Sequence, residues 1–354
     1  MPARVAINGF GRIGRAFFRA SYHCANKDIV AINDLVDAPT LVHYLKYDSV
    51  HGCFSPEIEL GTDGFSINGK ETKVFRQPNP RMLPWRELDV DIVIESSGCY
   101  TDRVHSEKHL QAGAGSVIVS APAQDADLTV CMGINQEQYQ PERHRIISNA
   151  SCTTNCLAPV AKVIMEQFGF VKGMLNTVHS YTNGQVIHDV PLPDLRRGRA
   201  AGQSMIPTTT GAAKAVTSVL PELEGKLIGM AVRVPVPNVS LIDLVVETEK
   251  KVTDLEVNAA LKQAAEGALK GVLEYCEVPL VSKDFTGNPA SAIVDAELTA
   301  VVGDNLVRVI AWYDNEWGYS SRLVDVVEYM TVKKQKGRGK WDDVPFGLLC
   351  ELGR

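Results

Sequence analysis

The sequence is poor in cysteine and has no residues spaced as metal ligands. Its 354 residues contain only 8 cysteines, far below the density of a disulfide-stabilised scaffold. Cys152 and Cys156 lie four positions apart, but no second pair or nearby histidine cluster completes a zinc site. We therefore expect no metal, and free, mostly buried thiols such as a reducing cytoplasm maintains.

Long apolar runs and an excess of positive charge are also missing. No apolar segment approaches the roughly 20 residues that a membrane span requires, and Met1–Arg4 leads into a strand-like segment without a signal-peptide pattern. The formal net charge of −6 excludes a large basic face, so nucleic-acid binding is not indicated. The length predicts about two domains, and we expect a cytoplasmic protein with no membrane partner.

Short apolar strands alternate with helices over residues 1–150. Strand patterns lie at 4–8, 29–33, 91–95 and 116–120, with helical patterns between them at 12–23, 40–46 and 103–112. This alternation predicts βαβ units and a parallel sheet. We predict an α/β domain of the doubly wound, Rossmann type.

Longer strand patterns follow at 230–234, 239–247 and 308–313, with helical patterns at 157–166, 212–220 and 255–269. They predict an α+β catalytic domain with a mixed or antiparallel sheet over 151–315. A helix at about 316–331 is assigned back to the first domain, and 332–354 is a C-terminal tail. Residues 181–204 have little periodicity, so we expect a long ordered loop that serves a site or an interface.

The segment Gly9–Gly14 reads Gly-Phe-Gly-Arg-Ile-Gly and fits the dinucleotide-binding pattern G-x-G-x-x-G. It follows a strand pattern and opens a helix, where glycines allow a pyrophosphate to approach the helix N-terminus. Asp34 lies 20 residues after Gly14, where a carboxylate binds the ribose 2′-hydroxyl of NAD and repels the 2′-phosphate of NADP. We therefore predict an NAD-binding domain over 1–150. The alternative is an ordinary glycine-rich turn and strand-end aspartate.

Residues 149–155 precede an apolar helical pattern at 156–166, and Ser151 is placed to cap this helix, which puts Cys152 in its first turn. A thiol in the first turn experiences the positive end of the helix dipole, which favours the reactive thiolate. Pro159 lies inside the pattern, so we expect a kink or break nearby. His179 follows a strand pattern and is the best of the 8 histidines to act as base. From the residues alone, Cys152 as a small buried hydrophobe remains an alternative.

Six segments resemble, in the same order, the phosphorylating glyceraldehyde-3-phosphate dehydrogenases. The longest, Ser148–Pro159, reads Ser-Asn-Ala-Ser-Cys-Thr-Thr-Asn-Cys-Leu-Ala-Pro and is highly specific. The others are 6–15, 179–183, 207–214, 233–238 and 312–319, so the resemblance covers roughly residues 3–331. It implies NAD as cofactor and a homotetramer in which the loop 181–204 reaches towards a neighbour's cofactor.

The resemblance also implies a mechanism. Cys152 attacks the aldehyde of glyceraldehyde 3-phosphate, His179 accepts a proton as hydride leaves for the nicotinamide, and inorganic phosphate releases 1,3-bisphosphoglycerate from the thioester. Thr182 and Arg233 are implied for the substrate's phosphate. Attacking phosphate is implied at Ser151, Thr153, Arg197, Thr210 and Gly211, with Arg196 as the alternative to Arg197. The implied cofactor residues are Gly9, Gly11, Arg12, Ile13, Gly14, Asp34, Ser120, Asn315 and Tyr319.

The chain departs from the family pattern in places. Gly184 stands where most members have Asp, and Pro78 takes the place of an adenine-side Arg, for which Arg76 is the candidate substitute. The tail carries a basic run and Cys350. One alternative is erythrose-4-phosphate dehydrogenase, a relative on the same scaffold that lacks the Thr-Thr-Thr-Gly pattern of 208–211. Another is a non-catalytic binding protein, which the intact Cys152 and His179 argue against.

Overall fold

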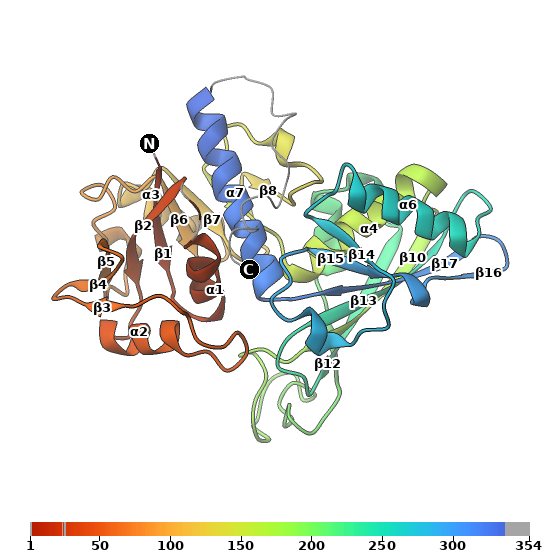
Figure 1. Ribbon diagram of the computed structural model, residues 1–354, viewed down its shortest axis with the longest axis horizontal. Coiled ribbons are helices and arrows are strands. Elements are labelled where there is room, and N and C mark those ends of the chain that lie inside the picture. The colour runs from red at the N-terminus through yellow and green to blue at the C-terminus, as the bar shows by residue number, and fades with distance from the viewer. Residues whose placement is uncertain (1, 23, 25, 337–354) are drawn as a thin grey trace.

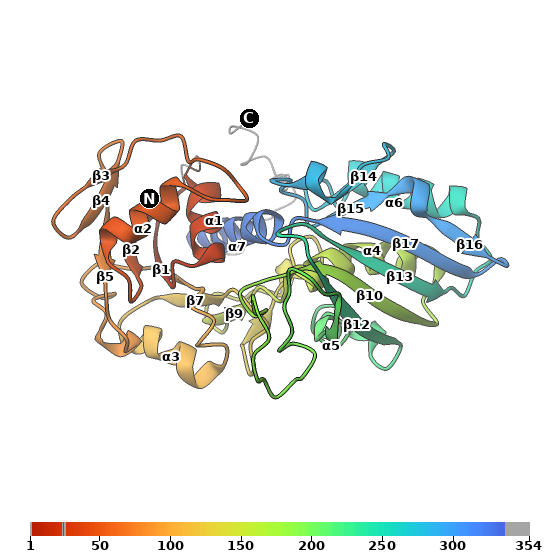
Figure 2. The same cartoon turned by 90° about the horizontal axis from the view of Figure 1, so that it is seen from below.

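The chain forms two lobes, each built around its own sheet (Figure 1). The computed structural model describes residues 2–22, 24 and 26–336. The long helix α7 (Trp317–Lys336) lies between the two lobes in both views (Figures 1 and 2). The tail from 337 onward, with Cys350, lies outside the described residues.

The first sheet has nine strands in the order β3-β4-β5-β2-β1-β6-β7-β9-β8. Its strands are β1 (Ala3–Asn8), β2 (Lys27–Asn33), β3 (Glu59–Leu60), β4 (Gly64–Ile67), β5 (Lys70–Phe75), β6 (Ile92–Glu95), β7 (Ser116–Val119), β8 (Leu128–Thr129) and β9 (Ile146–Ser148). All pair in parallel except at the β3-β4-β5 edge. Because β1 lies between β2 and β6, the strand order reverses there, and such a point is where open parallel sheets bind ligands.

Helices connect these strands as the sequence predicts. They are α1 (Arg12–Ser21), α2 (Ala38–Lys46) and α3 (Arg103–Gln111). Although α7 comes last, its Tyr319, Leu323 and Val327 join the core that includes Phe10 and Phe17 of the first lobe. The doubly wound α/β fold predicted for this lobe is therefore confirmed, with α7 packed on α1.

The second sheet is mixed, in the order β11-β12-β10-β13-β17-β15-β14, with β16 beside β17. Its strands are β10 (Lys172–Ser180), β11 (Ile206–Thr209), β12 (Leu227–Val234), β13 (Ser240–Glu247), β14 (Leu273–Cys276), β15 (Ala292–Asp295), β16 (Ala300–Val302) and β17 (Leu306–Tyr313). Only β10–β12 and β14–β15 pair in parallel. Its helices are α4 (Cys152–Phe168), α5 (Ala212–Ala215) and α6 (Asp254–Glu266).

The two faces of the second sheet differ. One face packs on α4 and α6 through a large apolar core that contains Leu175 and Leu244. On the other face, Met174 is 64% exposed, its register partner Ile228 is 64% exposed and Met230 is 44% exposed. A row of exposed apolar side chains on a regular sheet is a surface that a partner can cover.

Several sequence predictions need correction in detail. The helix predicted at 157–166 begins at Cys152 and runs unbroken through Pro159 to Phe168, so the expected break does not occur. The helix predicted at 212–220 is the short α5 followed by a 3-10 turn, Val216–Ser218. Other 3-10 turns are Pro80–Met82, Gln136–Gln138, Pro221–Leu223, Ser282–Phe285 and Ala296–Leu298. Residues 181–204 form the expected long loop, green at the lower edge of Figure 1.

Candidate active site

A cleft of about 300 Å³ opens at the carboxyl ends of β1, β2 and β6, and the glycine-rich segment forms part of its wall. Gly9 has φ +91°, and a Cβ there would lie 2.4 Å from the backbone of Ser97. A Cβ on Gly14 would lie 2.3 Å from the carbonyl oxygen of Gly9. Only glycine fits these two positions. At Gly11, which lines the cleft, a Cβ would meet nothing within 4 Å, so this backbone is open to a ligand.

Asp34 also lines this cleft, as the sequence predicts. Its Oδ2 accepts the Phe10 backbone N–H at 2.7 Å, and its Oδ1 accepts that of Val36 at 3.2 Å. These bonds fix the carboxylate beside the glycine-rich turn. Pro78 and Tyr100 line the cleft as well, whereas the guanidinium Nε of Arg76 donates to the carbonyl of Leu35 at 3.1 Å.

Cys152 is the first residue of α4, and Ser151 caps the helix as predicted. The Ser151 hydroxyl accepts the Thr154 backbone N–H at 3.0 Å. The preceding Ala150 has φ +53°, a conformation uncommon for residues other than glycine. The buried hydroxyl of Tyr319 donates to the Ala150 carbonyl at 3.0 Å, so α7 supports the turn that aims Cys152.

His179 and Arg233 lie side by side because they are register partners on the parallel strands β10 and β12. The Sγ of Cys152 lies 3.5 Å from Nε2 of His179. On the far side of the ring, Nδ1 lies 2.7 Å from the Ser180 carbonyl and 2.5 Å from Nη1 of Arg233. Arg233 also donates to the Ser180 carbonyl at 3.1 Å. Thiol, imidazole and guanidinium therefore form one cluster.

Burial dominates the electrostatics of this cluster. It lowers the pKa of His179 from 6.5 to about 3, and the positive charge of Arg233 adds to the effect. Burial also raises the pKa of the Cys152 thiol, although Arg233 and hydrogen bonding with Thr153 oppose the shift. The expectation of a thiolate favoured by the helix dipole is therefore not met here. The imidazole is neutral and able to accept a proton.

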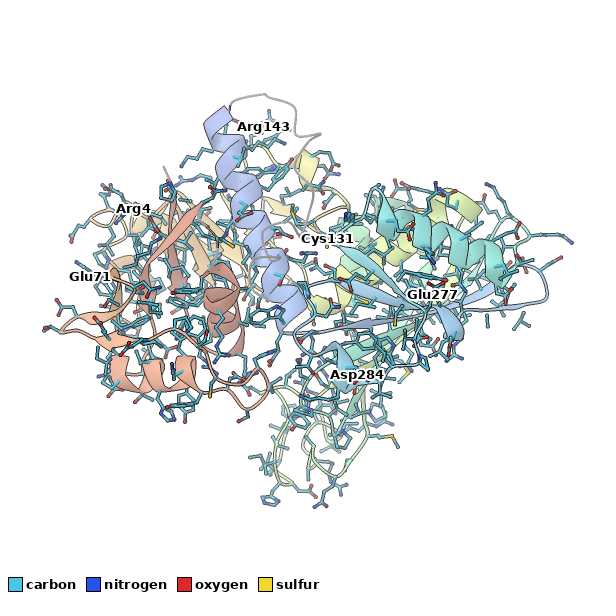
Figure 3. The ribbon with its side chains drawn as sticks, in the orientation of Figure 1. Arg4, Glu71, Cys131, Arg143, Glu277 and Asp284 are labelled. Carbon is cyan, nitrogen blue, oxygen red and sulfur yellow. The ribbon has the colours of Figure 1, made fainter. Side chains whose placement is uncertain are left out.

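The neighbouring thiols are less accessible. Cys156, one helical turn after Cys152, is completely buried, and burial raises its pKa well above the usual value. Cys131 lies near the junction of the lobes (Figure 3), and burial raises its pKa to about 12. Neither approaches a described histidine in the way that Cys152 approaches His179.

The loop 181–204 brings Arg197 towards this cluster. An Nη2 of Arg197 lies 3.5 Å from the carbonyl oxygen of Gly184, and its charge adds to the burial that lowers the pKa of Arg233. The backbone N–H groups of Arg196 and Arg197 both donate to Asp194, at 2.9 and 3.3 Å. The exposed Thr182 hydroxyl bonds to the side chain of Gln185.

The remaining anion-site candidates lie at two helix starts. Thr210 and Gly211 precede α5, where the Thr210 hydroxyl accepts the Ala212 N–H at 3.2 Å. Ser151 and Thr153 lie at the start of α4. The hydroxyl of Thr153 lies 2.8 Å from that of the buried Tyr313, so it is already engaged on one side.

Asn315 lies just before α7, where the chain returns to the first lobe. Its Oδ1 accepts hydrogen bonds from the hydroxyls of Ser180 and Ser240, both at 2.9 Å. Asp314 holds the start of α7 by accepting the Glu316 and Trp317 backbone N–H groups at 2.9 and 2.7 Å. Ser120 follows β7, and its backbone N–H donates to the carbonyl of Glu95 at 2.9 Å.

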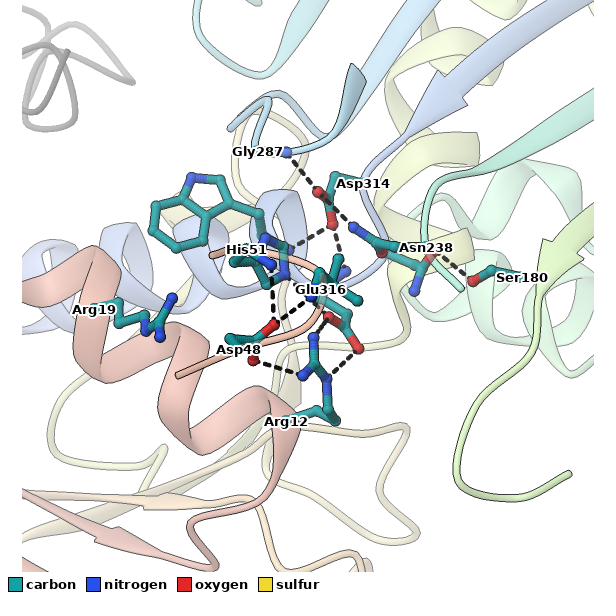
Figure 4. Close-up of polar contacts among 12 residues, drawn as sticks. Arg12, Arg19, Asp48, His51, Ser180, Asn238, Gly287, Asp314 and Glu316 are labelled. Carbon is teal, nitrogen blue, oxygen red and sulfur yellow. Dashed lines mark hydrogen bonds and ion pairs between the residues drawn. The ribbon is translucent and has the colours of Figure 1, made fainter. Parts of the chain in front are cut away.

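The Arg12 side chain belongs to an ionic cluster that sequence analysis missed (Figure 4). Arg12 pairs with Glu316 and, at 2.6 Å, with Asp48, while His51 lies 3.0 Å from Glu316. Burial opposes ionisation of Asp48, but backbone hydrogen bonds and Arg12 lower its pKa to about 2. Arg12 is thus tied to the start of α7. Its partners are up to 304 residues away, so no local signal reveals them.

Comparisons with known proteins match both lobes. The model of the glyceraldehyde 3-phosphate dehydrogenase NAD binding domain matches residues 3–103, and that of the C-terminal domain matches 151–315. The chain belongs to the glyceraldehyde-3-phosphate dehydrogenase family. It is 58% identical over 333 residues to the glyceraldehyde-3-phosphate dehydrogenase of Geobacillus stearothermophilus, covering 94% of this chain and 99% of the relative.

Two further relatives are similar over the same span. The identity is 57% over 330 residues with glyceraldehyde-3-phosphate dehydrogenase 1 of Bacillus cereus, covering 93% of this chain and 99% of the relative. It is 55% over 332 residues with the enzyme of Streptomyces coelicolor, with the same coverage. The chain is an NAD-dependent dehydrogenase of glyceraldehyde 3-phosphate, as the resemblance implies.

Three observations concern metal ligands, membrane spans and the cofactor of this dehydrogenase. Within residues 2–22, 24 and 26–336, no three His, Cys, Asp or Glu side chains are grouped as metal ligands. Over the same described residues, no helix is long and apolar enough to cross a bilayer. The cleft fits NAD, because it combines an open glycine backbone with a fixed carboxylate.

Proposed function

We propose that this dehydrogenase acts through a covalent thioester on Cys152, with His179 as its base. The observation that carries the proposal is that Cys152 Sγ, at the N-terminus of α4, lies 3.5 Å from Nε2 of the neutral His179 imidazole. A nucleophile and base within this reach can form and resolve a covalent intermediate.

The chemistry follows from these two side chains. Cys152 Sγ bonds to the aldehyde carbon, and the thiol proton passes through His179 Nε2 to the new oxygen, giving a hemithioacetal. His179 then takes this hydroxyl proton as the C–H electron pair leaves as hydride, so that a thioester remains. Bound NAD supplies the acceptor for the hydride. Phosphate next bonds to the acyl carbon, its own proton goes to the departing sulfur, and the proton on His179 is released to water.

Arg233 has two roles in this proposal. With Thr182 it binds the phosphate group of the substrate, for which a guanidinium offers a fork of donors. In the free enzyme its charge also lowers the pKa of His179, after the larger effect of burial. A bound phosphate dianion offsets that charge, so substrate binding raises the basicity of His179 when a base is needed.

Inorganic phosphate is proposed to bind among Ser151, Thr153, Arg197, Thr210 and Gly211. The choice of Arg197 over Arg196 is supported by the position of its guanidinium beside Gly184 and its charge effect on Arg233. The hydroxyls and backbone N–H groups at the starts of α4 and α5 supply further donors for an anion.

NAD is proposed to lie across the cleft and the junction of the lobes. Gly9, Gly11 and Gly14 hold the turn, and the N–H groups of Arg12 and Ile13 at the start of α1 face the pyrophosphate. Asp34 binds the adenosine ribose and disfavours NADP. Asn315 is the proposed partner of the nicotinamide carboxamide, beside Ser120. Tyr319 acts through Ala150 rather than by touching the ring, because it is buried in the core.

We also propose a cytoplasmic homotetramer. The uncovered apolar face of the second sheet, with Met174 and Ile228, supports burial against another subunit. Ile187 and Leu195 of the loop 181–204 are 84% and 81% exposed, which favours a contact beyond this chain. The proposed domains are 1–150 with 316–331 for NAD, and 151–315 for catalysis.

A kinetic comparison of Cys152→Ser with Cys156→Ser tests this proposal. Wild type and Cys156→Ser should form NADH from glyceraldehyde 3-phosphate in a phosphate-dependent reaction, whereas Cys152→Ser should form almost none. Erythrose 4-phosphate as substrate in the same assay tests the alternative function, erythrose-4-phosphate dehydrogenase. Activity in Cys152→Ser, or a higher catalytic efficiency with the tetrose, would contradict the proposal.

A further inference from the structure

A buried carboxylate that the mechanism does not use lies directly beneath the nucleotide cleft. Glu95 ends β6 and is 2% exposed. Its register partner on β1 is Asn8, and the partner of Asn8 on β2 is Asn33. Asn33 donates to Asn8 Oδ1 at 2.7 Å, and Asn8 donates to Glu95 Oε2 at 2.6 Å. A hydrogen-bonded row therefore crosses the carboxyl ends of three adjacent strands at the switch point.

The direction of every hydrogen bond to Glu95 can be assigned. The indole Nε1–H of Trp85 lies 3.0 Å from Nδ1 of His109, and indole only donates, so Nδ1 accepts. The proton of His109 then lies on Nε2, which donates to Glu95 Oε2 at 3.0 Å. Glu95 Oε1 accepts the backbone N–H and the hydroxyl of Ser97 at 2.8 and 2.6 Å. Each oxygen thus accepts two donors.

This network ends in the walls of the cleft, although Glu95 itself does not line it. Asn8, Asn33 and Ser97 line the cleft. Asn33 further fixes the lining residue Gln77, by donating to its carbonyl at 2.9 Å and accepting its N–H at 2.8 Å. Trp85 and His109 are both fully buried, so the support beneath the cleft is rigid and shielded from water.

We propose that Glu95, held by His109 and Trp85, is a positioning residue for NAD. It sets the spacing of the floor and the serine wall of the cleft, and so acts on nucleotide affinity without touching the chemistry at Cys152. The inference rests on the proposed position of NAD in this cleft.

Glu95→Gln is the informative substitution because the amide cannot satisfy the site. Wherever its NH₂ group lies, it opposes a fixed donor, either the Ser97 N–H or the pair from Asn8 and His109. Hydrogen bonds to a charged group are strong enough that we expect the Kd for NAD to rise at least about tenfold. The rate of Cys152 alkylation by iodoacetamide in the NAD-free enzyme should stay within about twofold of wild type.

Glu328→Gln is the matched control. Glu328 is also buried and pairs with buried Lys27 at 2.6 Å, but Lys27 begins β2 at the opposite end of the sheet. This variant should lower Tm and leave the Kd for NAD unchanged. Trp85→Phe removes the indole N–H together with part of the ring and should raise the Kd for NAD a few-fold. It is the second variant if Glu95→Gln does not fold.

Calorimetric titration of each variant with NAD, with Tm measured in parallel, tests the positioning role of Glu95. Asp34→Ala reports on the site itself: if it binds NAD like wild type, the proposed position of NAD fails. If the affinity for NAD falls in Asp34→Ala but is unchanged in a folded Glu95→Gln, the positioning role of Glu95 alone fails. The positioning role would also be overturned if Glu328→Gln lost as much NAD affinity as Glu95→Gln for the same loss of Tm. Where Glu95→Gln does not fold, an unchanged Kd for NAD in Trp85→Phe would overturn it.

Discussion

Replacing Arg233 with Met should raise the pKa of His179. The pKa of the imidazole is lowered from 6.5 to about 3, first by burial and then by the Arg233 charge, whose Nη1 lies 2.5 Å from Nδ1. Because Arg233 is the smaller of the two causes that lower the pKa, its removal should restore only part of the depression. We expect the pKa to rise by about 1 to 2, equivalent to about 1.4 to 2.7 kcal/mol.

The assay is an NMR titration of enzyme with isotope-labelled histidine rings, in which the His179 signal is assigned by its loss in His179→Gln. The sign is fixed, because removing a positive charge favours the protonated ring. Arg199→Met is the control, since Arg199 pairs with Asp189 on the surface of the same loop and should leave the pKa unchanged. An unchanged or lower pKa in Arg233→Met would refute the electrostatic coupling.

Three further outcomes are expected. Asp48→Asn should lower the free energy of unfolding by about 2 kcal/mol at neutral pH, because pairing with Arg12 and backbone N–H groups lowers the folded-state pKa from 3.8 to about 2. That contribution is present above the unfolded pKa and is lost as pH falls through about 2, so urea unfolding should show the two proteins converging in acid; a constant gap would contradict this. Asp34→Ala should raise kcat/KM for NADP at least about tenfold relative to NAD by removing a repulsive charge, and an unchanged ratio in steady-state assays would speak against its role. Arg197→Ala should raise KM for phosphate at least about tenfold, whereas Arg196→Ala should change it less than about twofold, and the reverse order would reassign the site.

The parts of the site that depend on short-range geometry could be predicted from the sequence. The glycine-rich turn, the cap at Ser151 and the position of Cys152 follow from short-range geometry, and the structure has them as expected. The approach of His179 to Arg233 depends on the register of β10 and β12, which no local pattern encodes. Sequence analysis did not predict this contact, because the family resemblance implied only separate roles for the two residues.

Other features escaped prediction for physical reasons. The strands of 59–75 lie at an edge of the first sheet and alternate weakly, with exposed Glu71 and Lys73 beside buried Thr72. Pro159 does not break α4, which is buried from Thr153 to Ala161 on both sides of the proline. The thiol pKa was expected to follow the helix dipole, but burial of Cys152 outweighs that effect.

Trapping the acylated enzyme tests the central claim most directly. Enzyme mixed with NAD and glyceraldehyde 3-phosphate in the absence of phosphate should release a burst of about one NADH per site. Peptide mass spectrometry should then find the 3-phosphoglyceroyl group on Cys152, and added phosphate should remove it. A burst without any cysteine adduct, or an adduct on another cysteine such as Cys99, would contradict the account.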